Sequence, residues 1–250
     1  MATKDKRMNR TKIEWADAVW NPVTGCSPIS RGCERCYAAR MAKRFAGRFG
    51  YPKKDPFRIT VHIERFHEPF NRINPKMIFV CSMGDLFHAS VPLERIIYVF
   101  EIMLAADWHT YIILTKRPFR MMKVVKMIRD KYPQYDLDNI WLGVTVEDNS
   151  AMVRLLPLLR TSIPVHFVSF EPLLERIKPP EHFDQLSWVI CGAETGPRAR
   201  PMDPKWAREL LSQCRDMNIP FFMKQMSRGD PIPKDLMVRQ YPKILEKAAT

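Results

Sequence analysis

The sequence predicts one α/β domain folded as an incomplete barrel of about six or seven parallel strands. Short apolar runs rich in Val, Ile, Phe and Trp recur along the chain, as expected for buried parallel strands. Stretches with helical spacing of apolar residues separate these runs, which is typical of βαβ units. Polar residues follow almost every run, where a strand would end.

The expected elements alternate in chain order. Strands are expected at 18–24, 77–82, 111–114, 140–146, 165–170, 188–191 and 220–223, and helices at 36–49, 93–106, 119–131, 149–160 and 203–217. The last helix opens with Asp203 as a cap and Pro204 at the first helical position. A doubly wound open sheet is the alternative fold, because the strand count fits both.

Composition favours a folded protein outside the membrane. Of the 250 residues, 46% are hydrophobic and 27% are charged, as in globular proteins. We expect a single domain over 1–250, with 50–70 as an inserted loop or hairpin and 230–250 as a peripheral tail. No apolar run reaches the roughly 18–20 residues that span a bilayer, and the charged start MATKDKRMNRTK does not resemble a signal peptide. These features predict a cytoplasmic protein, and they do not indicate its oligomeric state.

The net charge of +13 is concentrated near the start of the chain. Residues 1–60 contain 14 Lys and Arg against 5 Asp and Glu, a local excess of +9. Such an excess favours a polyanionic partner, either nucleic acid or a phosphorylated substrate. The alternative explanation is a well-solvated surface without such a partner, because a count of charges does not show whether they lie together.

Cys26, Cys33 and Cys36 are the strongest chemical signal, with the spacing C-x6-C-x2-C on the loop after the first expected strand. Three thiolates without an evident fourth ligand suit a cluster of four irons with one iron left open. They also suit zinc completed by water or a histidine, although His62, His67 and His88 lack motif spacing to the cysteines. The other three cysteines lie in apolar or helical contexts and are expected to be buried thiols.

The rest of the sequence favours an iron–sulfur cluster over zinc. A structural zinc site commonly has two CxxC-type pairs, and this chain has one. A three-cysteine loop after the first strand of a βα barrel resembles the layout of radical S-adenosylmethionine (SAM) enzymes. In that superfamily the open iron binds the amino and carboxylate groups of SAM, and reduction yields a 5′-deoxyadenosyl radical. The resemblance implies a barrel of radical SAM type with a 4Fe-4S cluster and SAM as cofactors.

The polar residues at the strand ends form a second group of candidates. They are Gly84, Asp85, Lys116, Thr145, Glu147, Ser169, Glu171, Gly192, Glu194 and Lys224. The carboxyl ends of parallel strands meet at one edge of a sheet, so these residues should share one cavity with the cysteine loop. Asp85 could instead cap the following helix.

Several segments resemble the phage-associated three-Cys-motif proteins, a radical-SAM-like family of unassigned function found in phages, prophages and bacteria. The segments are TKIEWADAVWNPVTGCSPISRGCERCYA, SMGDLFH, LTKRP, WLGVTVE, VSFEPLL, CGAETGPRARPM and PFFMKQ, and the resemblance covers roughly residues 11–228. Two departures from the common radical SAM pattern stand out. The first cysteine gap is six residues, with Arg35 before Cys36, and Met83-Gly84-Asp85 replaces Gly-Gly-Glu.

The radical SAM resemblance also implies roles. Asp85 with Gly84 would hold the SAM amino group, Gly192 and Glu194 the adenine, and Thr145, Glu147 and Ser169 the ribose. Glu171, Lys224 and Lys116 are the catalytic candidates. The main hypothesis is a radical SAM-like enzyme with an external electron donor, acting on a nucleotide or nucleic acid because of the basic charge and the phage setting.

Two other functions remain open. The first is a zinc-stabilised nucleic-acid-binding protein without catalysis, although the carboxylates at the rim would repel phosphate. The second is a divalent-metal hydrolase that uses Asp85, Glu147, Glu171 and Glu194. That second function leaves the three cysteines without a role.

Overall fold

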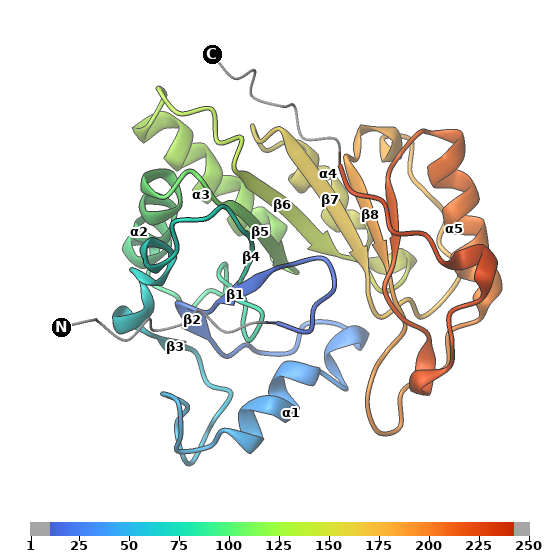
Figure 1. Cartoon of the computed structure of the whole chain (residues 1–250), viewed down its shortest axis with the longest axis horizontal. Helices are drawn as coiled ribbons and strands as arrows, with labels where there is room; N and C mark the ends of the chain where they lie inside the picture. Colours follow the sequence, from blue (N-terminus) through green and yellow to red (C-terminus); the bar gives the residue numbers. More distant parts are fainter. Residues whose placement is uncertain (1–10, 243–250) are drawn as a thin grey trace.

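The computed structural model describes residues 11–242 and contains a curled sheet of seven strands (Figure 1). In sheet order these are β1 (Ala18–Trp20), β4 (Met77–Val80), β5 (Thr110–Thr115), β6 (Ile140–Thr145), β7 (Val165–Phe170), β8 (Trp188–Cys191) and β9 (Phe221–Met223). Every neighbouring pair is parallel. The order follows the chain without a reversal, so the predicted incomplete barrel is confirmed. The doubly wound alternative is wrong, because it needs a switch point in the strand order.

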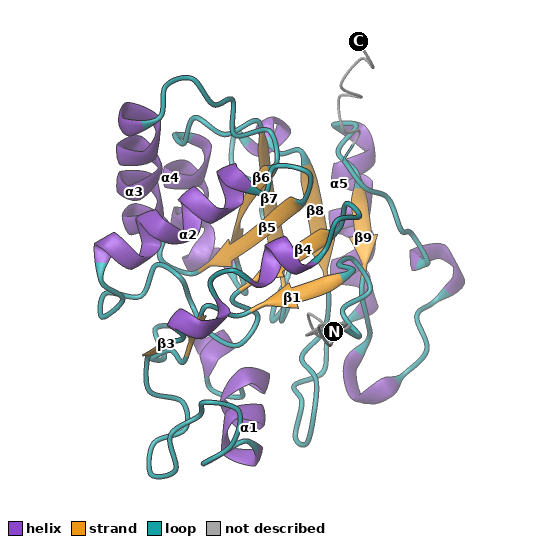
Figure 2. Ribbon diagram, turned by 60° about the vertical axis from the view of Figure 1, so that its left-hand side comes forward, coloured by secondary structure: helices purple, strands orange, loops and turns teal. Residues whose placement is uncertain are grey.

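The helices that connect the strands cover the outer face of the sheet (Figure 2). They are α2 (Leu93–Ala105), α3 (Pro118–Lys131), α4 (Leu155–Leu159) and α5 (Pro204–Asp216). The Asp203 carboxylate caps α5 by accepting from the Lys205 amide at 2.9 Å, as the sequence indicates. The helix expected at 149–160 divides instead into a 3-10 turn, Asn149–Arg154, and the short α4.

The α1 helix (Tyr37–Arg44) stands apart from the others, below the sheet in the view of Figure 1. It ends earlier than the expected 36–49, and a turn containing Gly47 in the left-handed region (φ 73°) follows it. The strand expected at 18–24 is also interrupted, at Asn21 and Pro22. Its second part, β2 (Val23–Thr24), pairs antiparallel with β3 (Thr60–Val61), which belongs to the 50–70 segment.

Two apolar cores lie on opposite faces of the sheet. The larger one packs the strands against the helices. The smaller one contains no helix residue and fills the concave face with Trp15, Phe79, Ile112, Trp141, Phe167, Trp188, Ile190 and Phe222. Gly143 is necessary there, because a Cβ atom at this position would lie 2.4 Å from the Phe167 ring.

The same pleat positions the candidate site. Side chains alternate between the two faces of a strand, so the concave side of β7 carries Phe167 and then Ser169, and Glu171 follows the strand. The other strands repeat this pattern, with apolar side chains first and polar ones at the carboxyl end. The half-barrel therefore has an aromatic floor and a polar rim.

The segment after β9 returns to the sheet. Arg239 forms a bridge to Phe222, and the Gln240 carbonyl accepts a hydrogen bond from the Trp188 indole at 2.9 Å. The predicted tail at 230–250 is thus in contact with β8 and β9 as far as Tyr241, and 243–250 lie outside the described residues. Within 11–242, no helix is both long enough and apolar enough to cross a membrane.

Candidate functional site

A cavity of about 1160 Å³ opens at the carboxyl ends of the strands. Its walls include most of the residues singled out from the sequence: Cys26, Cys33, Cys36, Gly84, Asp85, Lys116, Thr145, Ser169, Glu171, Glu194 and Lys224. Two predicted residues, Glu147 and Gly192, lie behind its wall. The strand ends and the cysteine loop therefore meet as the βα pattern predicts.

The three cysteines are half-buried and none forms a disulfide. Burial raises the pKa of Cys26, and the nearby Asp85 carboxylate raises it further against the opposing Arg117 guanidinium. Burial also acts to raise the pKa of Cys33. Hydrogen bonds from Ile29 and Ser30, with the charge of Lys116, outweigh that effect and leave the pKa below its ordinary value. Cys33 is therefore the thiol that ionises more readily of the two.

Asp85 is buried and forms an ion pair with Arg117. One oxygen accepts from the Thr115 hydroxyl at 2.7 Å and the Phe87 amide at 2.9 Å. The other accepts from the Arg117 guanidinium at 2.8 Å. The same guanidinium nitrogen lies 3.3 Å from the Cys26 sulfur, so Arg117 connects the carboxylate to the cysteine loop. The alternative role of Asp85 as a helix cap is wrong, because the next helix, α2, begins only at Leu93 and has Pro92 at its N-cap position.

Glu147 is fully buried and paired with two cations. Its carboxylate accepts from Arg154 at 2.7 Å and lies 3.7 Å from the Lys116 ammonium. It also accepts from the Gly32 amide at 3.3 Å, within the cysteine loop. Burial acts to raise the pKa of Glu147, but Lys116, Ser30 and Arg154 outweigh it and hold the pKa below its usual value. Glu147 thus stays ionised and supports the loop from behind the cavity wall.

Glu194 binds the cysteine loop near Cys36, through Arg35. Its carboxylate accepts from the Arg200 amide at 2.8 Å and from the Arg200 Nε at 3.0 Å. It also lies 3.3 Å from a guanidinium nitrogen of Arg35. Arg200 extends further to the Glu34 carboxylate at 3.1 Å and to the Arg31 carbonyl at 3.0 Å. The cysteine loop and the loop after β8 are thereby held together.

Glu171 and Lys224 form an ion pair at the cavity rim, 2.5 Å apart. Glu171 also accepts a hydrogen bond from the side-chain amide of Gln225 at 3.0 Å. A Cβ atom at Gly192 would lie 2.8 Å from the Gln225 side chain. Gly192 therefore leaves space for the Gln225 side chain. Gln225 lines the cavity and Gly192 lies behind it.

Ser169 is the one cavity-lining serine, among residues 11–242, whose hydroxyl is buried without a hydrogen-bond partner. The residue is 1% exposed. It stands directly opposite Thr145 in the register of β6 and β7. A buried hydroxyl without a partner costs free energy, so this position is suited to a ligand that supplies the missing hydrogen bond.

The histidines considered as metal ligands have other partners. His62 contacts the Thr24 hydroxyl at 2.8 Å, His88 contacts the Ser27 hydroxyl at 2.7 Å, and His67 contacts the Tyr98 hydroxyl at 3.2 Å. Over the described range of the chain, no three His, Cys, Asp or Glu side chains are gathered closely enough to hold a metal ion.

The sequence pattern assigns no role to Arg154 and Arg200, and it leaves Arg117 as either a surface charge or a binder of phosphate or carboxylate; in the structure each of the three neutralises a predicted carboxylate. Arg117 and Arg200 stand within the quoted segments LTKRP and CGAETGPRARPM, so the signal was present. Arg200 pairs with Glu194 within one loop, whereas Arg117 reaches Asp85 from the end of a different strand.

A family model described as "Protein of unknown function (DUF5131)" matches residues 10–243. The chain belongs to this family. No curated protein matches the DUF5131 chain. Among solved structures, a cysteine-to-serine mutant of spore photoproduct lyase matches with a TM-score of 0.54 and 12% identity, over 87% of this chain and 78% of that one.

A second structure of spore photoproduct lyase, a double mutant with bound AdoMet and dinucleoside spore photoproduct, matches with the same TM-score of 0.54, at 11% identity. It also covers 87% of the DUF5131 chain and 78% of its own. At this identity the likeness establishes the half-barrel fold. The bound AdoMet and dinucleoside belong to the lyase.

Proposed function

We propose that this DUF5131 protein is an iron–sulfur enzyme of radical SAM type that acts on a nucleotide or nucleic acid. The observation that carries the proposal is the single cavity of the half-barrel. It brings three cysteines of one loop together with the polar ends of six strands. The same fold occurs in a lyase with bound AdoMet and dinucleoside spore photoproduct, which supports the cofactor and the substrate class.

The donor set fits a 4Fe-4S cluster. Cys26, Cys33 and Cys36 are free, half-buried and on one cavity wall. The charge of Lys116 favours the thiolate of Cys33, and Arg117 beside Cys26 opposes the effect of burial on that thiol. Binding requires the 26–36 loop to bring the three sulfur atoms together, since they are not gathered in the described conformation. Cys26, Cys33 and Cys36 would hold the cluster, which would supply the electron for reductive cleavage of SAM.

The cavity offers matching positions for SAM itself. Ser169 presents an unpartnered hydroxyl next to Thr145, as a ribose would need. Asp85 lies beside the cysteine loop and would accept from the SAM ammonium, sharing its carboxylate with Arg117. Glu171 and Lys224 lie on the same wall as an ion pair, where they would orient the substrate and hold a proton.

The described ion pairs disfavour the hydrolase alternative. The four carboxylates that would hold divalent ions, Asp85, Glu147, Glu171 and Glu194, each already have a cationic partner. A metal would have to displace an Arg or Lys from each one. For the zinc alternative, the three candidate histidines are engaged elsewhere, which leaves water as the fourth ligand.

Anaerobic reconstitution tests the cluster. The wild-type protein should bind about four irons and four sulfides per chain. Cys26→Ala, Cys33→Ala and Cys36→Ala should each lose most of the iron, and Cys214→Ala, at a fully buried cysteine of α5, should keep it. Stoichiometric zinc without visible absorbance would contradict the proposal.

A further inference from the structure

One wall of the cavity is made by α1 and the loop that follows it. Met41, Phe45, Phe49, Tyr51 and Phe57 all line the cavity there. The Phe45 ring packs edge-on against Phe49, with ring centroids 5.6 Å apart, and lies 5.5 Å from Tyr51. Aromatic rings therefore form a continuous surface beside the site.

Phe49 is the most unusual member of this wall. It is 69% exposed, so its ring gains little from burial. Its backbone adopts φ 52°, a left-handed conformation that is uncommon for a bulky residue. The Arg65 guanidinium binds the Phe49 carbonyl and fixes this turn. Strain that holds an exposed aromatic in place is typical of functional positions.

The outer edge of the wall is basic. Residues 37–58 carry seven Lys and Arg against one acidic residue: Arg40, Lys43, Arg44, Arg48, Lys53, Lys54 and Arg58. None of these seven is ion-paired to a carboxylate of residues 11–242. Elsewhere exposed basic residues do pair, as Lys126 does with Asp130 and Arg208 with Asp235.

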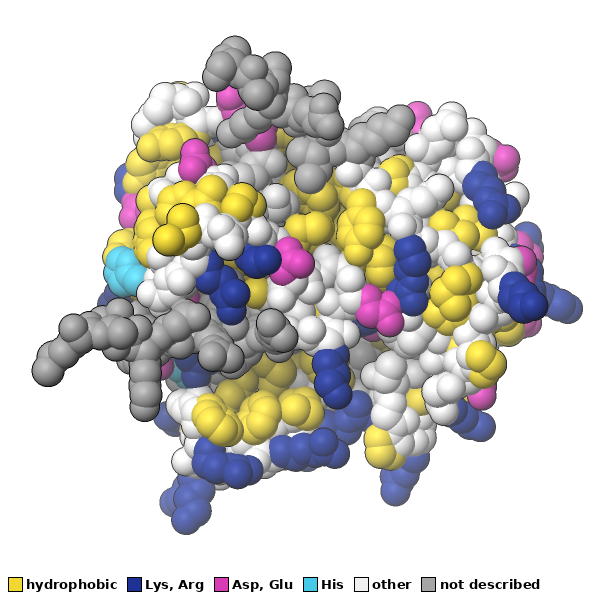
Figure 3. Space-filling view, in the orientation of Figure 1, with side chains coloured by type: hydrophobic (Ala, Val, Ile, Leu, Met, Phe, Trp, Pro, Cys, Tyr) yellow, Lys and Arg dark blue, Asp and Glu magenta, His cyan; other side chains and the backbone are white. Residues whose placement is uncertain are grey.

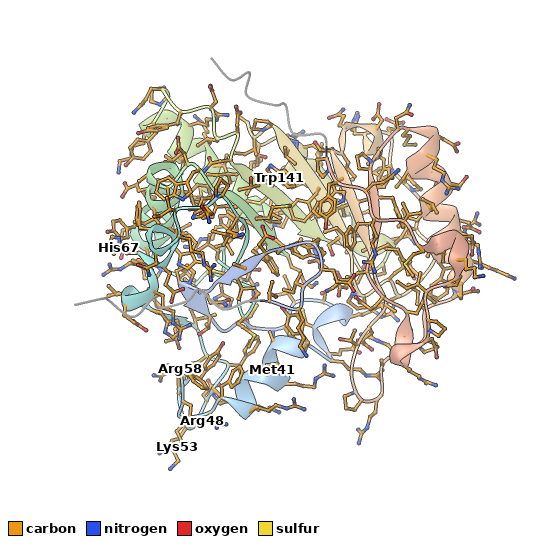
Figure 4. The ribbon with its side chains drawn as sticks, in the orientation of Figure 1. Met41, Arg48, Lys53, Arg58, His67 and Trp141 are labelled. Atoms are coloured by element: carbon orange, nitrogen blue, oxygen red, sulfur yellow. The ribbon has the colours of Figure 1, made fainter. Side chains whose placement is uncertain are left out.

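The figures show how the two features combine. In Figure 3, Lys and Arg side chains gather around a hydrophobic patch at the lower edge of the molecule, where α1 lies in Figure 1. Figure 4 labels Met41, Arg48, Lys53 and Arg58 in this region. Unpaired cations thus border an aromatic surface that continues into the cavity.

We infer that this wall binds single-stranded nucleic acid and leads one nucleotide into the cavity. Bases would stack on Phe49 and its aromatic neighbours, and phosphates would follow the basic edge. A duplex offers phosphates but no exposed base faces, and a lipid surface or a chain of acidic residues alone offers no planar rings. The inference rests on the proposed function, because it names the polymer delivered to that site.

Fluorescence anisotropy on the full chain, without iron or SAM, tests the aromatic part. The probe is a labelled single strand of about a dozen nucleotides, in DNA and RNA arms. Phe49→Ala should weaken binding roughly 5- to 140-fold, the loss of one stacked base. Tyr135→Ala removes another exposed aromatic, 41% exposed after α3, and should leave the affinity unchanged.

The salt dependence tests the basic edge. Replacing Arg48, Lys53 and Arg58 together by Ala should lower the slope of log affinity against log salt by about 2, given about 0.7 for each phosphate contact. The matched control replaces Lys123, Arg160 and Lys178, which are exposed and lie outside this wall. That control should retain the wild-type slope.

The outcomes separate this inference from the proposed function. Tight binding in either the DNA or the RNA arm supports the inference. Unchanged affinity of Phe49→Ala would overturn it, as would competition by duplex DNA, polyglutamate or anionic vesicles equal to that of the single strand. Strand binding without SAM cleavage would defeat the proposed function alone, and SAM cleavage without strand binding would defeat the inference alone.

Discussion

Ser169→Ala should change stability and ligand binding in opposite directions. The Ser169 hydroxyl is buried without a partner in the described residues, and such a group costs about 1–3 kcal/mol. Removing it should therefore stabilise the unliganded protein by up to about that amount. If SAM donates or accepts the missing hydrogen bond, the same change should weaken SAM binding by about 0.5–1.5 kcal/mol, or roughly 2- to 13-fold.

Ser227→Ala is the matched control. The Ser227 hydroxyl is also buried, but it accepts from the Met202 amide at 2.9 Å and donates to the Arg200 carbonyl at 3.1 Å. Its loss leaves the Met202 amide without an acceptor, so the protein should be destabilised by about 1–3 kcal/mol. SAM affinity should stay unchanged, because Ser227 does not line the cavity.

Urea unfolding and calorimetric titration with SAM, both on the cluster-loaded protein and its variants, measure the two effects. Destabilisation by Ser169→Ala would mean that the hydroxyl already has a structural partner. Unchanged SAM affinity in a stable Ser169→Ala protein would remove Ser169 from the binding site. Either result would refute the reasoning from the unpartnered hydroxyl.

Two further predictions concern the carboxylates. Asp85→Asn should keep the iron content and weaken SAM binding roughly 10- to 150-fold, the loss of a charge-assisted hydrogen bond of about 1.5–3 kcal/mol. Unchanged affinity in a calorimetric titration would exclude Asp85. Burial acts to raise the pKa of Glu194, but Arg200 and Arg35 outweigh it and hold the pKa below the ordinary 4.5. Its stabilisation is thus present above the unfolded pKa and is lost as pH falls through the folded one. Glu194→Gln should flatten this acid-side loss in urea unfolding, and an unchanged profile would contradict the ion pair.

The sequence predicted the sheet well because the strand signal is local. The apolar run around Phe167 and the polar residues after it follow from the two-residue period of a strand. That period also places Ser169 and Glu171 on the concave side, so the cavity-lining group could be predicted without coordinates. The interruption at Asn21 and Pro22 has a local signal too, because proline cannot donate to a strand ladder; the contact of Asn21 with the Met83 amide at 3.0 Å has none.

The partners that lie far away in the sequence were beyond the reach of sequence patterns. Arg35 and Glu194 pair although 159 positions separate them, and no periodicity encodes such a contact. Gly192 illustrates a second limit. The radical SAM resemblance implies that Gly192 contacts adenine, whereas in the structure the atom nearest to a Cβ at this position belongs to Gln225. A glycine in a sequence can indicate that another group packs closely against the backbone, but it does not indicate which group that is.

The central claim is tested most directly by SAM cleavage in the cluster-loaded protein. Anaerobic protein reduced with dithionite should convert SAM to 5′-deoxyadenosine and methionine in equal amounts, as reductive cleavage of one S–C bond requires. Cys33→Ala, assayed in parallel, should form neither product. A wild-type protein that carries a full cluster and yet neither binds nor cleaves SAM would contradict the account.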